Sequence, residues 1–367
     1  MIGELLGPGA KGHDGATNTP GLGARHWHPT KGAGEQTDYG DMALIGLDYA
    51  TTSPFEKGAV YEPQFAELSF AEHWRDWFRG YTGYRNFASS ETLQNIDSGT
   101  ALLKAASTQH DDFSGLARAA GLLFLPELYL SVQSKDTSGF SSADDGGSGT
   151  FSITETKING ATLAHVAARS TAVTNDNVLS MMATDFFLRV TTSLILNPER
   201  PGVDSDDREG MVADRIRYAV TEASAHMQGK FGPKSSSILR TLVQWAEDKV
   251  VAAAQPAASN FLVMKNGRMM LDDVALMTLG DDYPCAKIGG CNYLEGRAKS
   301  SAVIGALPAS LYFILRYADD LPQALQRSAM CGGDSAARAV AIGMVLGAAQ
   351  VRDMHIYGSL LFTHCLK

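Results

Sequence analysis

Helical periodicity recurs along most of this chain, and it limits the fold more than any other feature of the sequence. Apolar residues spaced three and four apart mark one buried face of an α-helix. Strand-like alternation is scarce, and its clearest example is a hairpin predicted over 261–270 around Asn266-Gly267. No fixed period relates the helical segments, which argues against a solenoid. We therefore expect an all-α fold, a single orthogonal multi-helix domain with loop insertions.

The expected helices follow from this spacing and from the positions of capping residues and proline. A densely apolar, buried helix is predicted to begin beside Thr37 and Asp38 and to run on from Asp41. Residues 65–81 predict an amphipathic helix with an aromatic face. The other predicted helices cover 91–96, 100–107, 113–130, 161–170, 177–196, 207–227, 235–254, 300–317, 322–329 and 335–350.

Two segments lack this periodicity. Residues 1–33 are rich in glycine and predict an irregular N-terminal arm, which we expect to contact a protein assembly. Residues 131–157 are rich in Ser, Gly and Asp, a composition that fits an interdomain linker or a surface insertion. We favour the insertion, so the folded domain is expected to cover 34–367.

Charge, hydropathy and cysteine spacing exclude several classes of protein. The 31 basic and 40 acidic residues give a net charge of −9, and no basic run indicates nucleic-acid binding. The longest apolar runs, 119–130 and 340–349, are shorter than the roughly 20 residues of a transmembrane helix. No CxxC spacing indicates a zinc site, while a disulfide between Cys285 and Cys291 stays open. We expect a soluble protein of the cytoplasm or an organelle lumen, without a transmembrane segment.

The first segment with chemical potential is Gly34-Glu-Gln-Thr-Asp-Tyr-Gly-Asp41, which leads into the predicted buried helix. A hydroxyl and a carboxylate at a helix start, here Thr37 and Asp38, can present oxygen ligands to a hard cation or bind polar substrate groups. The alternative is a helix cap, in which either side chain accepts hydrogen bonds from backbone N–H groups.

The second segment runs from Ala329 to Ala348 and opens with Cys331-Gly-Gly-Asp-Ser335. Its two glycines allow a tight turn, and Asp334 or Ser335 can cap the helix that follows. That helix carries many alanines and glycines, so another helix can approach it closely. We expect it at the centre of the fold.

Together the two segments resemble the signature pair of the ADP-ribosylglycohydrolase superfamily, in its dinitrogenase-reductase-activating and crystallin-like branches. In that family a Thr-Asp-Asp-Thr stretch opens an early helix, and a Gly-Gly-Asp-x-Asp-Thr stretch opens a late helix of small residues. Gln36-Thr-Asp-Tyr-Gly-Asp41 stands in the place of the first stretch and Gly332-Gly-Asp-Ser-Ala-Ala-Arg338 in that of the second. Segments that fit the family order between them are 77–84, 115–120, 183–190 and 307–312. The resemblance covers about 34–350.

This resemblance implies the family's all-α fold and two Mg²⁺ ions between the helix starts. There the ions would bind ribose hydroxyls and help to cleave an N- or O-glycosidic bond of ADP-ribose. The positions that match metal ligands are Thr37, Asp38 and Asp334. The positions expected to contact a ligand are Thr37, Asp38, Tyr39, Gly333 and Ser335.

Three oxygen donors of the family pattern are replaced, by Tyr39, Ala336 and Ala337. Methyl groups, or a phenol with an ordinary pKa of about 10, do not restore the octahedral oxygen coordination of Mg²⁺. We therefore expect no metal, or one Mg²⁺ held by Thr37, Asp38, Asp41 and Asp334. The family's early Gly-Asp-Ala-x-Gly helix has no counterpart in 1–33, so no catalytic residue is assigned. His165 is interpreted as a structural histidine.

Three functions remain open. The favoured hypothesis is a non-catalytic structural or partner-binding member with a degenerate metal centre. The alternative is a Mg²⁺-dependent hydrolase that cleaves ADP-ribosyl N- or O-glycosidic bonds on proteins. A third hypothesis is binding of an ADP-ribose-type ligand without cleavage, with Tyr39, Tyr81 or Tyr84 stacked on the base.

Overall fold

The computed structural model describes residues 36–52, 63–123, 169–196, 211–227, 231–254, 263–265, 268–270, 302–330 and 334–350. The chain divides into two compact units. The early unit is Asp38–Leu188, and the late unit comprises Met1–Thr37 and Arg189–Lys367. The predicted arm 1–33 and the whole predicted insertion 131–157 lie outside the described residues, as do Cys285, Cys291 and His165. The division into arm, domain and insertion stays a prediction.

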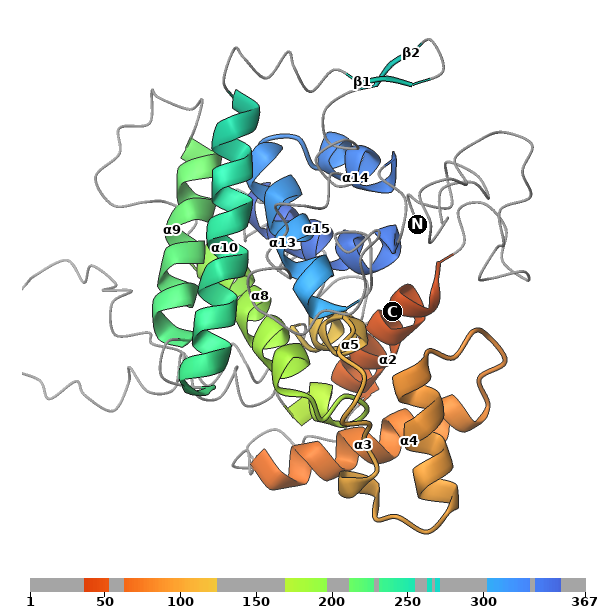
Figure 1. Cartoon of the computed structure of the whole chain (residues 1–367). Helices are drawn as coiled ribbons and strands as arrows, with labels where there is room; N and C mark the ends of the chain where they lie inside the picture. The colour runs from red at the N-terminus through yellow and green to blue at the C-terminus, as the bar shows by residue number, and fades with distance from the viewer. Residues whose placement is uncertain are drawn as a thin grey trace, which may run out of the picture. The chain divides into compact units, whose positions relative to one another are not determined.

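Helices dominate both units, which confirms the all-α class (Figure 1). The early unit contains α2 (Asp38–Thr52), α3 (Pro63–Arg79), α4 (Phe87–Asp97), the short 3₁₀ helix η2 (Leu102–Lys104), α5 (Ser114–Leu122) and the first part of α8 (Val178–Leu196). The late unit contains α9 (Met211–Met227), α10 (Gly232–Ala254), α13 (Val303–Arg316), α14 (Leu321–Met330), α15 (Ser335–Gln350) and the strands β1 (Val263–Lys265) and β2 (Arg268–Met270).

In the early unit α2 and α5 pack at unusually short range, and Figure 1 shows them side by side. A Cβ atom on Gly46 would lie 2.1 Å from the Arg118 carbonyl oxygen, and one on Gly121 would lie 2.3 Å from the Ala43 carbonyl oxygen. Both distances are far below van der Waals contact. Only glycine at these two positions lets the backbones of α2 and α5 approach so closely.

The aromatic face predicted over 65–81 packs as a ladder on α3. The rings of Trp74 and Phe78 stack with centroids 5.0 Å apart, and both side chains are buried. Tyr49 of α2 contacts Phe70 edge-on at 5.0 Å. Offset and edge-on arrangements of this kind are favoured by the ring quadrupoles. The ladder therefore joins α3 to α2.

α4 is longer than the helix predicted over 91–96, because a cap lies further upstream. The Asn86 side-chain oxygen accepts a hydrogen bond from the Ser89 N–H at 2.9 Å, which starts the helix at Phe87. Gly99 follows the helix with a φ of 92°, a value that favours glycine at a helix C-terminus.

The helix predicted over 100–107 is wrong. Only Leu102–Lys104 form a 3₁₀ turn. Ser107 instead makes an isolated parallel bridge with Asn175: its N–H donates to Thr174 O at 3.0 Å, and its carbonyl accepts from Asp176 N–H at 2.8 Å. Pairing with a distant segment satisfies the backbone groups that a helix would have used.

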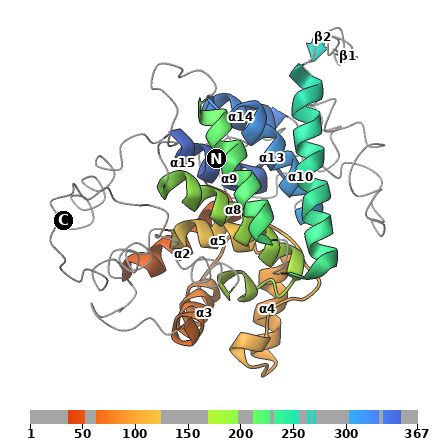
Figure 2. The ribbon, with the colours of Figure 1, turned by 90° about the vertical axis from the view of Figure 1, so that its left-hand side faces the viewer.

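In the late unit α13 is enclosed by other helices, and α15, predicted to be central, packs against it. α13 is apolar around nearly its whole circumference and contacts α9, α10, α14 and α15. Such a helix is stable only when it is enclosed on all sides. Figure 2 shows α13 from a second direction, beside α10. On α15 Ala336, Ala337, Ala341 and Ala349 are buried, whereas a Cβ on Gly343 or Gly347 would meet nothing within 4 Å.

The hairpin predicted over 261–270 is confirmed, with β1 and β2 antiparallel and Lys265 paired with Arg268. Among the described residues, α8 contains one stretch, Val178–Ile195, with enough length and hydropathy to cross a membrane. That stretch is 67% buried within the protein, as is typical of a core helix.

Candidate functional site

The start of α2 is acidic and buried, as the sequence predicted. Asp38 and Asp41 are only 4% and 6% exposed, and Thr37 and Tyr39 are buried beside them. Asp38 opens the helix and Asp41 lies in the same first turn. Negative side chains are stabilised at this end of a helix by its dipole. The predicted cluster at the start of α2 is thus a packed part of the fold.

Tyr81 contacts this acidic cluster, and the sequence did not predict that contact. The Tyr81 hydroxyl donates a hydrogen bond to Asp41 Oδ2 at 2.5 Å. Burial raises the pKa of Tyr81 well above its usual range, and so do the hydrogen bond to Asp41 and the negative charges of Asp41 and Asp38. The phenol therefore stays protonated and acts as the donor. Tyr81 was predicted only as a ring that stacks on a base.

The start of α15 uses Asp334 as a cap. Asp334 Oδ1 accepts a hydrogen bond from the Ala337 N–H at 3.0 Å, which fixes the first turn of the helix. The prediction that Asp334 or Ser335 caps this helix is confirmed for Asp334. Ser335, Ala336 and Ala337 are buried at the same helix start, whereas Gly333 lies outside the described residues.

The predicted metal ligands are divided between the two units. Asp38 and Asp41 belong to the early unit, and Thr37 and Asp334 belong to the late unit. Their predicted juxtaposition stays a prediction. Within the described ranges, no three His, Cys, Asp or Glu side chains form a group that could hold a metal ion.

A polar network in the early unit was not foreseen from the sequence. Its core is Arg118 of α5, which is fully buried. The guanidinium donates to Thr174 Oγ1 at 2.6 Å and, at 3.3 Å and 3.4 Å, to the carbonyl oxygens of Ser170 and Thr171. Burial lowers the pKa of Arg118 to about 10, and the charge of Asp112 partly opposes this effect.

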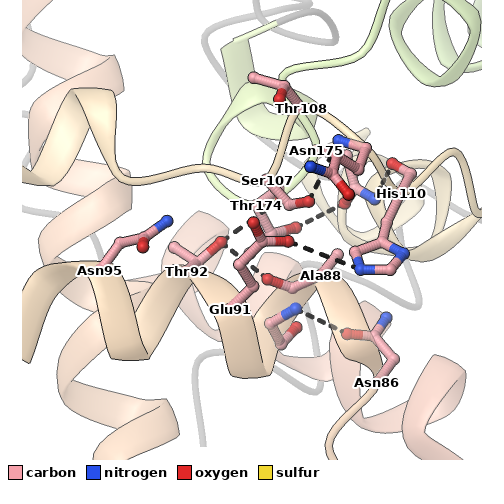
Figure 3. A network of polar contacts seen from close by, with 12 residues as sticks. Asn86, Ala88, Glu91, Thr92, Asn95, Ser107, Thr108, His110, Thr174 and Asn175 are labelled. Atoms are coloured by element: carbon pink, nitrogen blue, oxygen red, sulfur yellow. Dashed lines mark hydrogen bonds and ion pairs between the residues drawn. The ribbon is translucent and has the colours of Figure 1, made fainter.

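The network continues from Arg118 toward the surface through Thr174 and Asn175. Thr174 Oγ1 donates to Asn175 Oδ1 at 2.6 Å, and Asn175 Nδ2 donates to Asp112 Oδ1 at 3.2 Å. Figure 3 shows the outer part of the network, where Asn175 also donates to the His110 carbonyl oxygen and His110 Nε2 lies 3.5 Å from Glu91 Oε2. A buried cation is thus linked to a carboxylate by neutral polar groups.

The segment 115–120, singled out in the sequence, therefore holds a side chain that organises residues 170–175. The sequence signal was an arginine within an otherwise small and apolar helix, Ser114-Gly-Leu-Ala-Arg-Ala-Ala-Gly-Leu122. Charged residues are almost never fully buried unless they are hydrogen-bonded, so an arginine in that setting indicates a partner.

Known proteins that are similar in sequence or structure indicate the family of this chain. A family model described as ADP-ribosylglycohydrolase matches residues 2–350. The chain belongs to the ADP-ribosylglycohydrolase family. A solved structure titled "ADP-ribosylglycohydrolase-related protein complex" has 15% sequence identity and a TM-score of 0.41, and the match covers 96% of this chain and 87% of that one. A search of curated proteins found no match.

Because the chain belongs to the ADP-ribosylglycohydrolase family, the oxygen donors at the starts of α2 and α15 can be compared with those that Mg²⁺ requires. The donor set predicted from the sequence is Thr37, Asp38, Asp41 and Asp334. Asp41 accepts a hydrogen bond from Tyr81, and Asp334 accepts one from a backbone N–H of its own helix. Mg²⁺ needs near-octahedral oxygen coordination. This set does not fit the pair of ions that the sequence resemblance implies.

Proposed function

We propose that this ADP-ribosylglycohydrolase-family protein has a degenerate metal centre and acts as a non-catalytic structural or partner-binding member. The observation that carries the proposal is the replacement of three oxygen donors by Tyr39, Ala336 and Ala337. Function resides in a site and not in a fold, so an intact helical scaffold does not by itself supply the family's chemistry.

The surroundings of the replaced positions support the same proposal. All three side chains are buried at the two helix starts, and the two alanine methyl groups offer no oxygen donor there. Tyr39 is 6% exposed. A buried phenol at ordinary pH is a neutral group and a poor substitute for a carboxylate ligand.

The experiment that tests the proposal combines calorimetry with turnover. Full-length protein is titrated with MgCl₂ and is assayed for release of ADP-ribose from modified arginine and serine peptides, with an active family member as positive control. We expect neither Mg²⁺ binding by Asp38 and Asp334 nor turnover above a blank. Mg²⁺-dependent release that disappears in Asp38→Asn, with the variant still folded, would overturn the proposal.

The second candidate is a Mg²⁺-dependent hydrolase that cleaves ADP-ribosyl N- or O-glycosidic bonds on proteins. The observation that favours it is the burial of Asp38 and Asp41 in one turn of α2, since clustered buried carboxylates bind cations. One hydrated Mg²⁺ on Thr37, Asp38, Asp41 and Asp334 is the centre it requires. The turnover assay decides between the two candidates.

The partner-binding role has its own readout. Full-length protein is purified from its native source under gentle conditions, and the mass of the particle is measured. A complex of fixed stoichiometry that is contacted by the N-terminal arm, as shown by cross-links from Lys11 or Lys31, supports the proposal. Recovery as a free chain in every preparation would count against a structural role.

A further inference from the structure

The Asp41 carboxylate accepts a hydrogen bond from a side chain of the same protein, Tyr81. The Tyr81 hydroxyl lies 2.5 Å from Asp41 Oδ2, at the short end of hydrogen bonds to carboxylates. Both groups belong to the early unit, and Asp41 is nearly inaccessible to solvent. A buried carboxylate requires hydrogen bonds or a cation to offset its loss of hydration. The Tyr81 hydroxyl supplies such a hydrogen bond.

The aromatic ring of Tyr81 is held by its neighbours. It stacks on Trp77 with centroids 5.0 Å apart and planes inclined by 27°, and it contacts Phe78 at 5.0 Å. A Cβ atom on Gly83 would lie 2.3 Å from the Tyr81 hydroxyl oxygen. The missing side chain at position 83 therefore leaves the space in which the hydroxyl reaches Asp41.

The backbone of Tyr81 is also fixed. Arg85 Nη2 donates to the carbonyl oxygen of Tyr81 at 2.8 Å and to that of Phe78 at 3.1 Å. These carbonyls lie at and just beyond the C-terminal end of α3, where backbone acceptors lack partners within the helix. Ring, hydroxyl and backbone of Tyr81 are thus each held by different neighbours.

We propose that Tyr81 is a positioning residue that replaces a cation at the Asp41 carboxylate, so that the acidic start of α2 is stable without metal. The proposal rests on the degenerate metal centre proposed above. The hydroxyl hydrogen occupies Asp41 Oδ2, and Mg²⁺ would have to displace it and also dehydrate in part. Removal of the hydroxyl takes away this hydrogen bond to Asp41 Oδ2, so Mg²⁺ no longer has to displace it.

The test compares full-length wild type, Tyr81→Phe and Tyr81→Phe/Asp41→Asn in EDTA and in millimolar MgCl₂. We expect the Tm of wild type to be the same in both buffers. Tyr81→Phe should lower the Tm in EDTA by about 3 °C, and Mg²⁺ should restore roughly half of this loss. The double variant should not respond to Mg²⁺. By calorimetry, Tyr81→Phe should bind Mg²⁺ at least about tenfold more tightly than wild type.

A substitution at Gly83 disrupts the hydrogen bond between Tyr81 and Asp41 without changing either residue. Gly83→Ala displaces the hydroxyl and leaves the phenol intact, so it should show the same Mg²⁺ response even if Tyr81→Phe does not fold. Tyr218→Phe on α9, where the side chain is half exposed, is the matched control and should behave as wild type.

The outcomes separate this inference from the proposed function. Equal Mg²⁺ affinity in wild type, Tyr81→Phe and Gly83→Ala would overturn the role of Tyr81, and so would Mg²⁺ binding by wild type that Asp41→Asn abolishes. Mg²⁺-dependent turnover by wild type that Asp41→Asn leaves unchanged would refute the proposed function and leave the role of Tyr81 intact.

Discussion

At the scale of single residues, Arg118 shows how this fold places a charge in its interior. The guanidinium is fully buried, yet its donors reach the carbonyls of Ser170 and Thr171 and the hydroxyl of Thr174. The two carbonyls belong to residues 169–172, which are helical, so the positive charge also lies beside carbonyls at the end of a helical turn. Hydrogen bonding and dipole together compensate the cost of burying the charge.

Arg118→Met should lower the free energy of unfolding by about 3 kcal/mol, because it removes the guanidinium's hydrogen bonds to two buried carbonyl oxygens and to the buried Thr174 hydroxyl. Urea denaturation measures this loss. Arg240→Met on the exposed face of α10 is the control and should change stability by less than about 0.5 kcal/mol. A similarly small effect of Arg118→Met would show that water replaces the guanidinium.

The pKa of Arg118 predicts how the stability difference between wild type and Arg118→Met depends on pH. A folded pKa of about 10, below the ordinary pKa of a guanidinium, means that burial disfavours the charged form. The folded state then binds fewer protons than the unfolded state only between these two pH values, and stability rises with pH there. Below that window both states are protonated. The stability difference between wild type and Arg118→Met should therefore be constant from about pH 6 to about pH 9.

At the scale of elements, buried or half-buried arginines satisfy the carbonyls at several helix ends. Arg215 of α9 donates to Leu194 O in the last turn of α8 and to Ala349 O in the last turn of α15, both at 3.1 Å. Arg338 of α15 donates to the Ser328 carbonyl oxygen near the end of α14 at 2.8 Å. Helix C-termini leave carbonyl groups without partners, and a cation there is favoured by the dipole. These arginines therefore join helix ends that the sequence alone does not relate.

Arg215→Lys should loosen two helix ends at once, because an ammonium group on a single stem does not reach both carbonyls in the geometry of the guanidinium fork. Hydrogen exchange should become about tenfold faster for amides in the last turns of α8 and α15. Arg217→Lys, two positions along the exposed face of α9, should leave exchange unchanged. Faster exchange in only one of the two helices would refute the shared clamp.

The contact between α2 and α5 makes a second prediction at this scale. Gly46→Ala places a methyl group 2.1 Å from a carbonyl oxygen, so we expect a loss of about 3 kcal/mol in the free energy of unfolding. Gly343→Ala in α15 meets no atom within 4 Å and should stabilise the protein by about 0.7 kcal/mol, the difference in helix propensity. Thermal unfolding of both variants measures the contrast. Equal effects would show that α2 and α5 separate easily.

Helix positions were largely predictable from the sequence, because apolar spacing reports burial. The predicted helix over 335–350 coincides with α15, and the one over 177–196 differs from α8 by one residue. The prediction failed at 100–107, where a bridge between Ser107 and Asn175 overrides local propensity. Long-range pairing of this kind leaves no periodic signal in the chain.

At the scale of the whole molecule, local features of the sequence were easier to predict than contacts between distant segments. The sequence located the acidic start of α2 and the capped start of α15, since capping residues and small residues are local signals. It did not reveal Tyr81 as the donor to Asp41, because the contact joins positions 40 residues apart through a loop. Nor did it reveal the arginine network, whose partners lie in a separate segment.

A restoration experiment tests whether the two helix starts act together, as the family resemblance predicts. Tyr39→Asp changes one start and Ala336→Asp changes the other. If the starts share one centre, the combined variant should gain more Mg²⁺ affinity than the product of the single gains, by about tenfold. Calorimetry measures this coupling, with circular dichroism to verify folding. Strictly multiplicative gains would indicate that the two helix starts bind ions independently.

The glycines between α2 and α5 have a consequence for the comparison of family members. Gly46 and Gly121 are fixed by steric necessity, so selection for folding alone keeps them even where turnover has vanished. Their retention in a sequence therefore records descent and a shared scaffold, and it carries no information about whether that lineage still hydrolyses anything.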